Sequence, residues 1–180
     1  SASNPVPGGA SRLADVADSG NCRLHKLSLP EIKPVATIGS FGEGDGQLHA
    51  PVGLALCQSP QHETLLVCAD SRNHRIVVFA TSPELRFVRK FASHGTGPGE
   101  LGPTSSGIYL AWCEGELFVA DRANHRLQVF TLDGRLLRTI GQRGTAPGCF
   151  RRIRGVTFSG LFFVFFFFSG VAGNRSSLCS

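Results

Sequence analysis

Three segments of the sequence repeat an aspartate, an asparagine and an arginine at fixed spacing. Each reads A-D-x-x-N-x-R followed by Leu or Ile. A carboxylate beside a guanidinium could work as an acid–base pair. A catalytic group is needed once, however, whereas a group that stabilises a turn is needed in every repeat, so we predict a structural turn clasp. Its residues are Asp18, Asn21, Arg23, Asp70, Asn73, Arg75, Asp121, Asn124 and Arg126.

The order of these residues predicts a tight hairpin turn. Aspartate can accept hydrogen bonds from backbone amides just downstream, and asparagine tolerates the left-handed conformation. The arginine then opens the return strand. This places the clasp at the tip of a hairpin, where it holds the turn closed.

Two histidines occupy the same place in this motif. His74 and His125 share one repeat position, and Cys22 stands there in the first copy. Equivalent side chains in neighbouring repeats could ring a metal, but a hairpin tip lies away from a common axis, so we expect surface turn residues. The six cysteines include no C-x-x-C pair, and no P-loop, G-x-S-x-G or H-E-x-x-H motif occurs. We therefore expect no catalytic residues, metal, cofactor or small-molecule substrate.

Positive charge is concentrated near the end of the chain. The formal net charge is +5, and 15 of the 18 basic residues are arginine. Arg143, Arg151, Arg152 and Arg154 lie close together with no acidic residue among them. Guanidinium groups bind phosphate in a fork, so this cluster favours an anionic partner such as RNA. A protein partner and a merely solvated rim are the alternatives.

Short apolar runs, separated by turns and glycine-rich loops, must position these side chains. Residues 65–68 and 116–119 suit strands buried on both faces. Each is followed by the clasp, a return strand, an outer strand and a glycine-rich loop. Four strands in an up-and-down meander, repeated about every 50 residues, predict an all-β fold that is a partial β-propeller of four-stranded blades.

The motifs resemble those of the NHL-repeat family. Residues 41–55 read F-G-x-G-x-G-x-L-x-x-P-x-G-L-A, and residues 117–130 read L-x-V-A-D-x-x-N-x-R-L-x-V-F. The resemblance implies a propeller, commonly of six blades, and a non-catalytic module that binds protein or RNA. Relatives among the tripartite-motif ubiquitin ligases also carry a RING domain, whose cysteine spacing is absent here. Three to four repeats cannot close such a ring, so further blades or another chain are needed.

One enzyme family provides an alternative. Residues 119–130 are similar to blades of peptidyl-hydroxyglycine amidating lyase. That similarity implies zinc held by histidines facing the central channel. The matching positions here are Val52, Ser106 and Arg154, which depart from the pattern. A lyase-like fragment is therefore kept only as the alternative function.

Two regions are expected along the chain. Residues 1–159 form the propeller fragment, with blade ends near 39, 93 and 141, and residues 160–180 form a Phe-rich tail outside the repeat. The apolar run at 161–168 is too short for a membrane helix, so a membrane partner is not expected. The run is consistent with an intron's pyrimidine tract read as protein, an artefact of the gene model. No signal peptide is visible, which leaves the compartment open with the cytoplasm slightly favoured.

Overall fold

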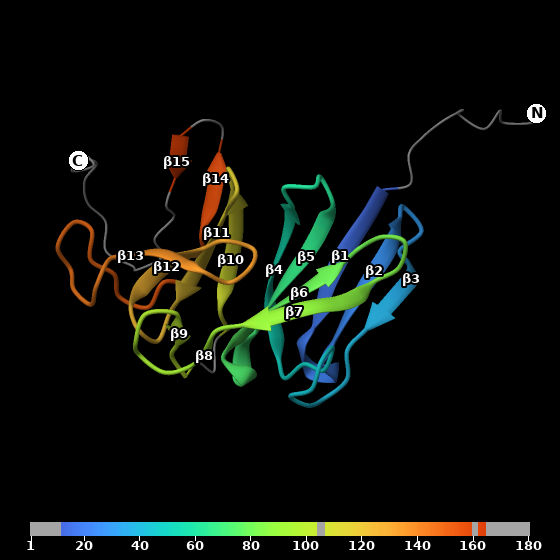
Figure 1. Cartoon of the computed structure of the whole chain (residues 1–180), viewed down its shortest axis with the longest axis horizontal. Coiled ribbons are helices and arrows are strands. Elements are labelled where there is room, and N and C mark those ends of the chain that lie inside the picture. The colour runs from blue at the N-terminus through green and yellow to red at the C-terminus, as the bar shows by residue number, and fades with distance from the viewer. Residues whose placement is uncertain (1–11, 104–106, 160–161, 165–180) are drawn as a thin grey trace, which may run out of the picture.

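The computed structural model describes residues 12–103, 107–159 and 162–164, and these residues are almost entirely strands, turns and loops (Figure 1). The all-β class and the blade architecture predicted from the sequence are confirmed. The strands are β1 (Arg12–Asp18), β2 (Arg23–Leu29), β3 (Lys33–Ile38), β4 (Pro51–Gln58), β5 (Thr64–Asp70), β6 (Arg75–Ala80), β7 (Arg86–Phe91), β8 (Ser93–His94), β9 (Glu100–Leu101), β10 (Tyr109–Cys113), β11 (Glu116–Asp121), β12 (Arg126–Phe130), β13 (Leu136–Ile140), β14 (Thr157–Ser159) and β15 (Phe162–Val164).

The main sheets are antiparallel meanders. Strands β4 to β7 form one four-stranded sheet, β10 to β13 form a second, and β1 to β3 form a three-stranded sheet. The first strand of each complete blade is the innermost: β4 contacts both β1 and β10 of the neighbouring sheets. In Figure 1 the three sheets stand side by side, with β1–β3 on the right and β10–β13 on the left.

The second strand of each blade is buried on both faces, which explains its continuous apolar sequence. In β5, Val67 and Ala69 pack toward the β10–β13 sheet, whereas Leu66 and Cys68 pack toward the β1–β3 sheet. The close fit between blades also requires a glycine. A Cβ at Gly53 would lie 2.5 Å from a backbone oxygen of the next blade. The blades are thus stacked through two-sided cores, as propeller blades must be.

A clasp around a buried aspartate holds a glycine-rich loop against the blade that follows the loop. Asp70 is fully buried, and its carboxylate accepts hydrogen bonds from the His49 backbone N–H at 2.6 Å and the Asn73 side chain at 2.8 Å. It also accepts from Arg75 Nε at 2.8 Å. Asn73 and Arg75 donate their remaining N–H groups to carbonyl oxygens of loop residues 42–47. The clasp therefore satisfies the polar backbone of a loop that arrives from the previous blade.

The next blade repeats the arrangement. Asp121, 1% exposed, accepts from the Gly102 backbone N–H at 3.0 Å, from Asn124 at 2.8 Å and from Arg126 Nε at 2.9 Å. The buried Gln128 adds a weaker contact at 3.3 Å. Asn124 and Arg126 again donate to carbonyl oxygens of the preceding glycine-rich loop.

The first copy of the clasp is more open. Asp18 accepts from Asn21 and from Arg23 Nε at 2.9 Å, but the two charged side chains are 25% and 43% exposed. The hydrogen bonds from Asn21 and Arg23 lower the pKa of Asp18. Unlike Arg75 and Arg126, Arg23 donates no side-chain hydrogen bond to a loop carbonyl of the described residues.

The turn differs from the sequence-based expectation in two details. The left-handed residue is the one after asparagine: Cys22, His74 and His125 have φ of 54°, 52° and 58°. The aspartates at positions 18 and 70 do not cap their own turns with a side-chain hydrogen bond. Their oxygens are taken by the asparagine and the arginine, which are stronger or better placed donors than the local amides.

The end of the chain is described only in part. Within the predicted tail, Phe162–Val164 form β15, which pairs with β14. The rest of residues 160–180 lies outside the described residues, so the predictions for this segment and for the blade ends stay predictions. Among the described residues, no helix is long and apolar enough to cross a membrane, and the five cysteines at 22, 57, 68, 113 and 149 are free thiols.

The two environments of the clasp predict different mutational costs. Asp121→Ala leaves Arg126, whose side chain is only 12% exposed, without its carboxylate, and we expect the free energy of unfolding to fall by about 3–5 kcal/mol. Asp18→Ala removes the same contacts where water can replace them, so its loss should be clearly smaller. Urea unfolding followed by the fluorescence of Trp112 measures both. Equal losses would contradict the role assigned to burial.

Candidate functional site

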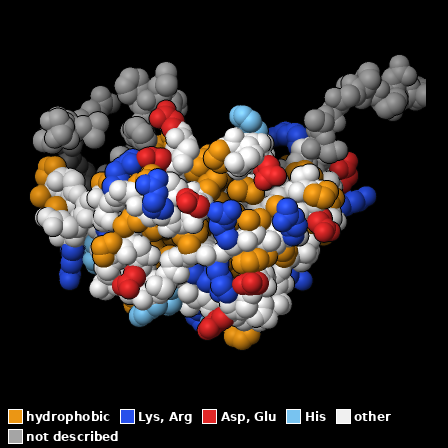
Figure 2. Space-filling model, in the orientation of Figure 1, with side chains coloured by type: hydrophobic (Ala, Val, Ile, Leu, Met, Phe, Trp, Pro, Cys, Tyr) orange, Lys and Arg blue, Asp and Glu red, His pale blue; other side chains and the backbone are white. Residues whose placement is uncertain are grey.

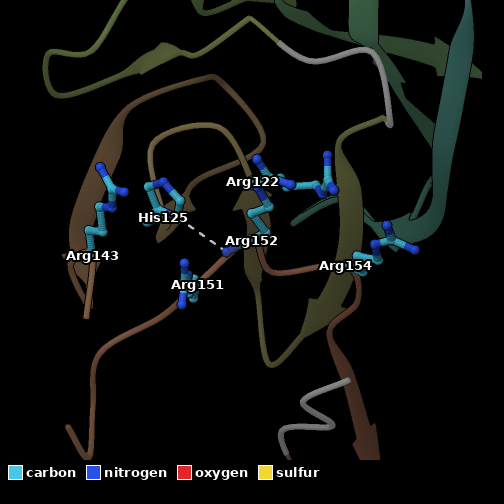
Figure 3. A pocket seen from close by; sticks show the side chains of 6 residues that line it. All are labelled: Arg122, His125, Arg143, Arg151, Arg152 and Arg154. Atoms are coloured by element: carbon cyan, nitrogen blue, oxygen red, sulfur yellow. Dashed lines mark hydrogen bonds between the residues drawn. The ribbon is translucent and has the colours of Figure 1, made fainter. Parts of the chain in front are cut away.

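One concave pocket lies at the end of the last complete blade. It has a volume of about 600 Å³ and is lined by six side chains: Arg122, His125, Arg143, Arg151, Arg152 and Arg154. Figure 3 shows that they come from three segments: the hairpin turn after β11, the glycine-rich loop after β13, and the stretch leading to β14. Segments up to about 30 residues apart in the sequence thus place their cationic side chains around one hollow.

The structure brings together all four arginines that the sequence singled out. It adds two residues of the turn, Arg122 and His125, which sequence reasoning assigned to no partner. His125 was expected to be an ordinary surface turn residue, but it lines the pocket and contacts the segment that carries Arg152. The candidate site is therefore larger than the predicted arginine cluster.

The pocket holds positive charge that is not balanced by acidic groups. None of its five arginines forms an ion pair with a carboxylate of the described residues, whereas Arg126 and Arg138 pair with Asp121 and Glu116. Figure 2 shows acidic and basic side chains interspersed over the broad face of the molecule. The lining of the pocket is a departure from that mixture, because it contains no acid at all.

Arg122 carries a further unmet interaction. Its Nε atom is buried and has no hydrogen-bond partner among the described residues. A buried cationic donor without an acceptor costs free energy, so this guanidinium favours an added anion.

His125 is held neutral by its surroundings. Its Nδ1 accepts a hydrogen bond from the Arg152 backbone N–H at 3.1 Å, which places the ring proton on Nε2. Burial, followed by the charges of Arg143, Arg152, Arg151 and Arg122, lowers the pKa of His125 below its ordinary value of 6.5. Near neutral pH the ring is therefore an uncharged hydrogen-bond donor among cations.

A comparison of the three repeats gives the signal that sequence reasoning missed. Phe41, His94 and Arg143 occupy one structural position, because each bridges in parallel to the last residue of its loop. Ser19 and Ser71 stand where Arg122 stands, directly after the clasp aspartate. The fold accepts neutral residues at these positions in the earlier repeats. The arginines of the last repeat are thus not demanded by the blade.

The position of Arg143 at the rim of the pocket is one that remains exposed to solvent in the earlier repeats, where another blade follows. Phe41 is 68% exposed and His94 is exposed, although a further blade follows each of them. Arg143, at the equivalent position, is also exposed. A ligand can therefore approach this position from solvent.

The other residues that the sequence singled out do not line this pocket. The clasp residues of the two later copies are engaged in the hydrogen bonds described above and serve the fold. Of the three positions matched to the lyase histidines, Val52 and Arg154 offer no zinc ligand, and Ser106 lies outside the described residues. Within the described part of the chain, no group of three His, Cys, Asp or Glu side chains could hold a metal ion.

Comparison with known proteins agrees with the repeat. The family model of the NHL repeat matches residues 106–130. The RING finger protein nhl-1 of Caenorhabditis elegans is 36% identical over 69 residues, which are 38% of this chain and 6% of that protein. This chain thus spans a small part of the length of its curated relative.

Two solved structures are similar in outline. Glutaminyl cyclase of Myxococcus xanthus aligns with 74% of this chain and 48% of its own, with 20% identity and a TM-score of 0.46. U3-55K aligns with 74% of this chain and 42% of its own, with 12% identity and a TM-score of 0.48. The chain spans less than half the length of either protein.

The sheets and the repeated clasp define a repeat module built of β-propeller blades. Residues 106–130 match the model of the NHL repeat, which confirms the resemblance to NHL repeats noted in the sequence.

The pKa of His125 is a measure of the positive charge around the pocket. We expect its pKa to lie below 6.5 and to rise in Arg143→Gln, which removes one neighbouring cation. Because the unfolded chain takes up this proton at a higher pH, the stability that His125 contributes is present above about pH 6.5 and is lost as the pH falls. Histidine NMR signals recorded against pH measure the shift. In the control Arg138→Gln, outside the pocket, the titration should not move.

Proposed function

We propose that this chain is a non-catalytic module that binds single-stranded RNA through the arginine-lined pocket. The observation that carries the proposal is a pocket lined by five arginines and no acidic residue, in which none of the five forms an ion pair with a carboxylate of the described residues. Such charges repel one another, and a phosphate-bearing partner relieves the repulsion while releasing its counterions.

The chemistry of the side chains supports phosphate as the group that is bound. Arginine presents a planar fork of donors that matches phosphate oxygens, and it stacks on exposed bases. A lysine-rich surface would offer only point charges. The exposure of Arg143, Arg151, Arg152 and Arg154 leaves their forks accessible from solvent.

Further blades, or a second chain, would complete the ring and extend this surface. The first sheet has three strands and the last complete blade is followed by the short pair β14–β15. The pocket itself needs only the described segments of this chain. The proposed RNA site is therefore a property of the last repeat and not of ring closure.

Salt dependence tests the proposal directly. We expect weak binding of an unstructured oligoribonucleotide, with the logarithm of the affinity falling by about 0.7 per phosphate contact for each logarithmic unit of salt. Changing Arg143, Arg151, Arg152 and Arg154 together to Ala should abolish most of the binding and flatten this slope. A filter-binding titration of the full chain at several salt concentrations measures both effects.

A second variant controls for net charge. Changing Arg86, Arg89, Lys90 and Arg135 to Ala removes four positive charges from exposed positions outside the pocket, so its binding should stay near that of the unchanged chain. If both variants bind equally well, or if affinity ignores salt, the RNA proposal is rejected and a protein partner takes its place.

A further inference from the structure

We propose that the pocket takes the terminal phosphate of an RNA strand, a phosphate monoester, in preference to a phosphodiester inside the strand. The inference rests on the proposed RNA binding and specifies which part of the RNA enters the pocket. It follows from the shape of the site, from the kinds of hydrogen-bonding groups that line it, and from the isolated Arg122.

The arginines come from three separate segments of the chain and line one pocket (Figure 3). A groove that tracks a nucleic-acid backbone places its cations along the path of the strand. Here the lining side chains gather from three segments around one hollow of about 600 Å³ (Figure 3). A terminal phosphate carries about −1.5 to −2 charges near pH 7, more than the single charge of a phosphodiester. The concentrated pocket therefore suits the group with the highest charge density on the strand.

The side chains of the lining are hydrogen-bond donors. A guanidinium has five N–H groups and no acceptor, and the Nδ1 of His125 is already taken by the Arg152 N–H, which leaves its Nε2–H as a donor. Side chains of this kind cannot read the donors on a base edge. They match a ligand made of acceptors, and the three terminal oxygens of a phosphate monoester offer the most acceptors in the least space.

Arg122 is the third argument that this repeat binds an anion. At the equivalent position, the Ser71 hydroxyl accepts the Ile108 N–H at 3.1 Å, and the Ser19 hydroxyl donates to the Pro51 carbonyl. These serines tie one blade to the next with neutral hydrogen bonds. In the last repeat the arginine at this position has a buried Nε–H with no acceptor among the described residues. A dense anion held by the surrounding arginines would offset that uncompensated charge.

The volume leaves room for more than the phosphate. A space of about 600 Å³ falls in the range of pockets that enclose small organic ligands. The phosphate and its attached ribose can both enter, whereas a strand bound at its middle would need two open ends for the chain to pass. A terminal phosphate with its ribose therefore fills the pocket better than an internal phosphodiester.

Oligoribonucleotides of one sequence that differ only at their ends provide the test. We compare a 5′-hydroxyl, a 5′-phosphate and a 3′-phosphate form by fluorescence anisotropy with the full chain, each labelled at the end that is not varied. A phosphorylated end should bind about tenfold more tightly than the hydroxyl form, because it adds charge-assisted hydrogen bonds. Inorganic phosphate should compete with the phosphorylated form more strongly than with the hydroxyl form.

Two variants assign the preference to the pocket. Arg122→Ser restores the residue found in the other two repeats and should remove the preference for a phosphorylated end, and Arg154→Gln, at an exposed position, should weaken it. Arg138→Gln, which lies outside the pocket, should keep the full preference. Retention of the preference in both pocket variants would overturn the assignment.

The outcomes separate this inference from the proposed function. If all three RNAs bind equally, with salt dependence that requires the four exposed arginines, the terminal site is wrong and RNA binding stands. If no RNA binds in a salt-dependent way, both proposals fall. If a phosphoserine peptide of equal charge binds more tightly than the phosphorylated RNAs, the source of the phosphate is a protein and the RNA-terminus assignment is overturned.

Discussion

The buried carboxylate of Asp70, repeated as Asp121, is the interaction on which the rest of the fold depends. A glycine-rich loop crosses between blades and exposes many backbone N–H and C=O groups. The aspartate binds one such N–H directly, and it orients an asparagine and an arginine whose donors satisfy the carbonyls. One charge thereby organises a long irregular segment that glycines alone would leave undefined. The arginine pocket depends on this order through Arg122 and His125, which lie in the turn between Asp121 and Arg126.

The sequence was sufficient to predict the strands because their burial leaves a direct trace. Residues 65–68 are apolar at every position, and the structure buries both faces of that strand. The turn was predicted less accurately. The asparagine side chain donates a hydrogen bond to the clasp aspartate, and the next residue, His74 or His125, adopts the left-handed conformation instead. This exchange depends on competition between donors for one carboxylate, which residue preferences do not describe.

The sequence indicated the charge of the candidate site but not its geometry. Four clustered arginines stand out in the sequence, whereas Arg122 and His125 belong to a distant turn. Their contact with the cluster spans 27 residues and requires the outer strand and the loop to return to the hairpin tip. Aligning the repeats by structural position makes the difference visible, since Arg143 replaces Phe41 and His94. Such a comparison separates residues that the blade needs from residues that one blade alone carries.

The left-handed residue after the asparagine is a position where the side chain can differ between repeats while the backbone stays the same. Cys22, His74 and His125 share one backbone conformation, yet they differ in chemistry. In the last two copies this side chain contacts the chain that leaves its own blade: the His74 ring packs edge-to-face against His94, and His125 accepts a hydrogen bond from the Arg152 N–H. At each of these positions the clasp fixes the backbone while the side chain is free to vary. Duplication of blades multiplies such positions, and selection can change the side chain of each one without altering the core.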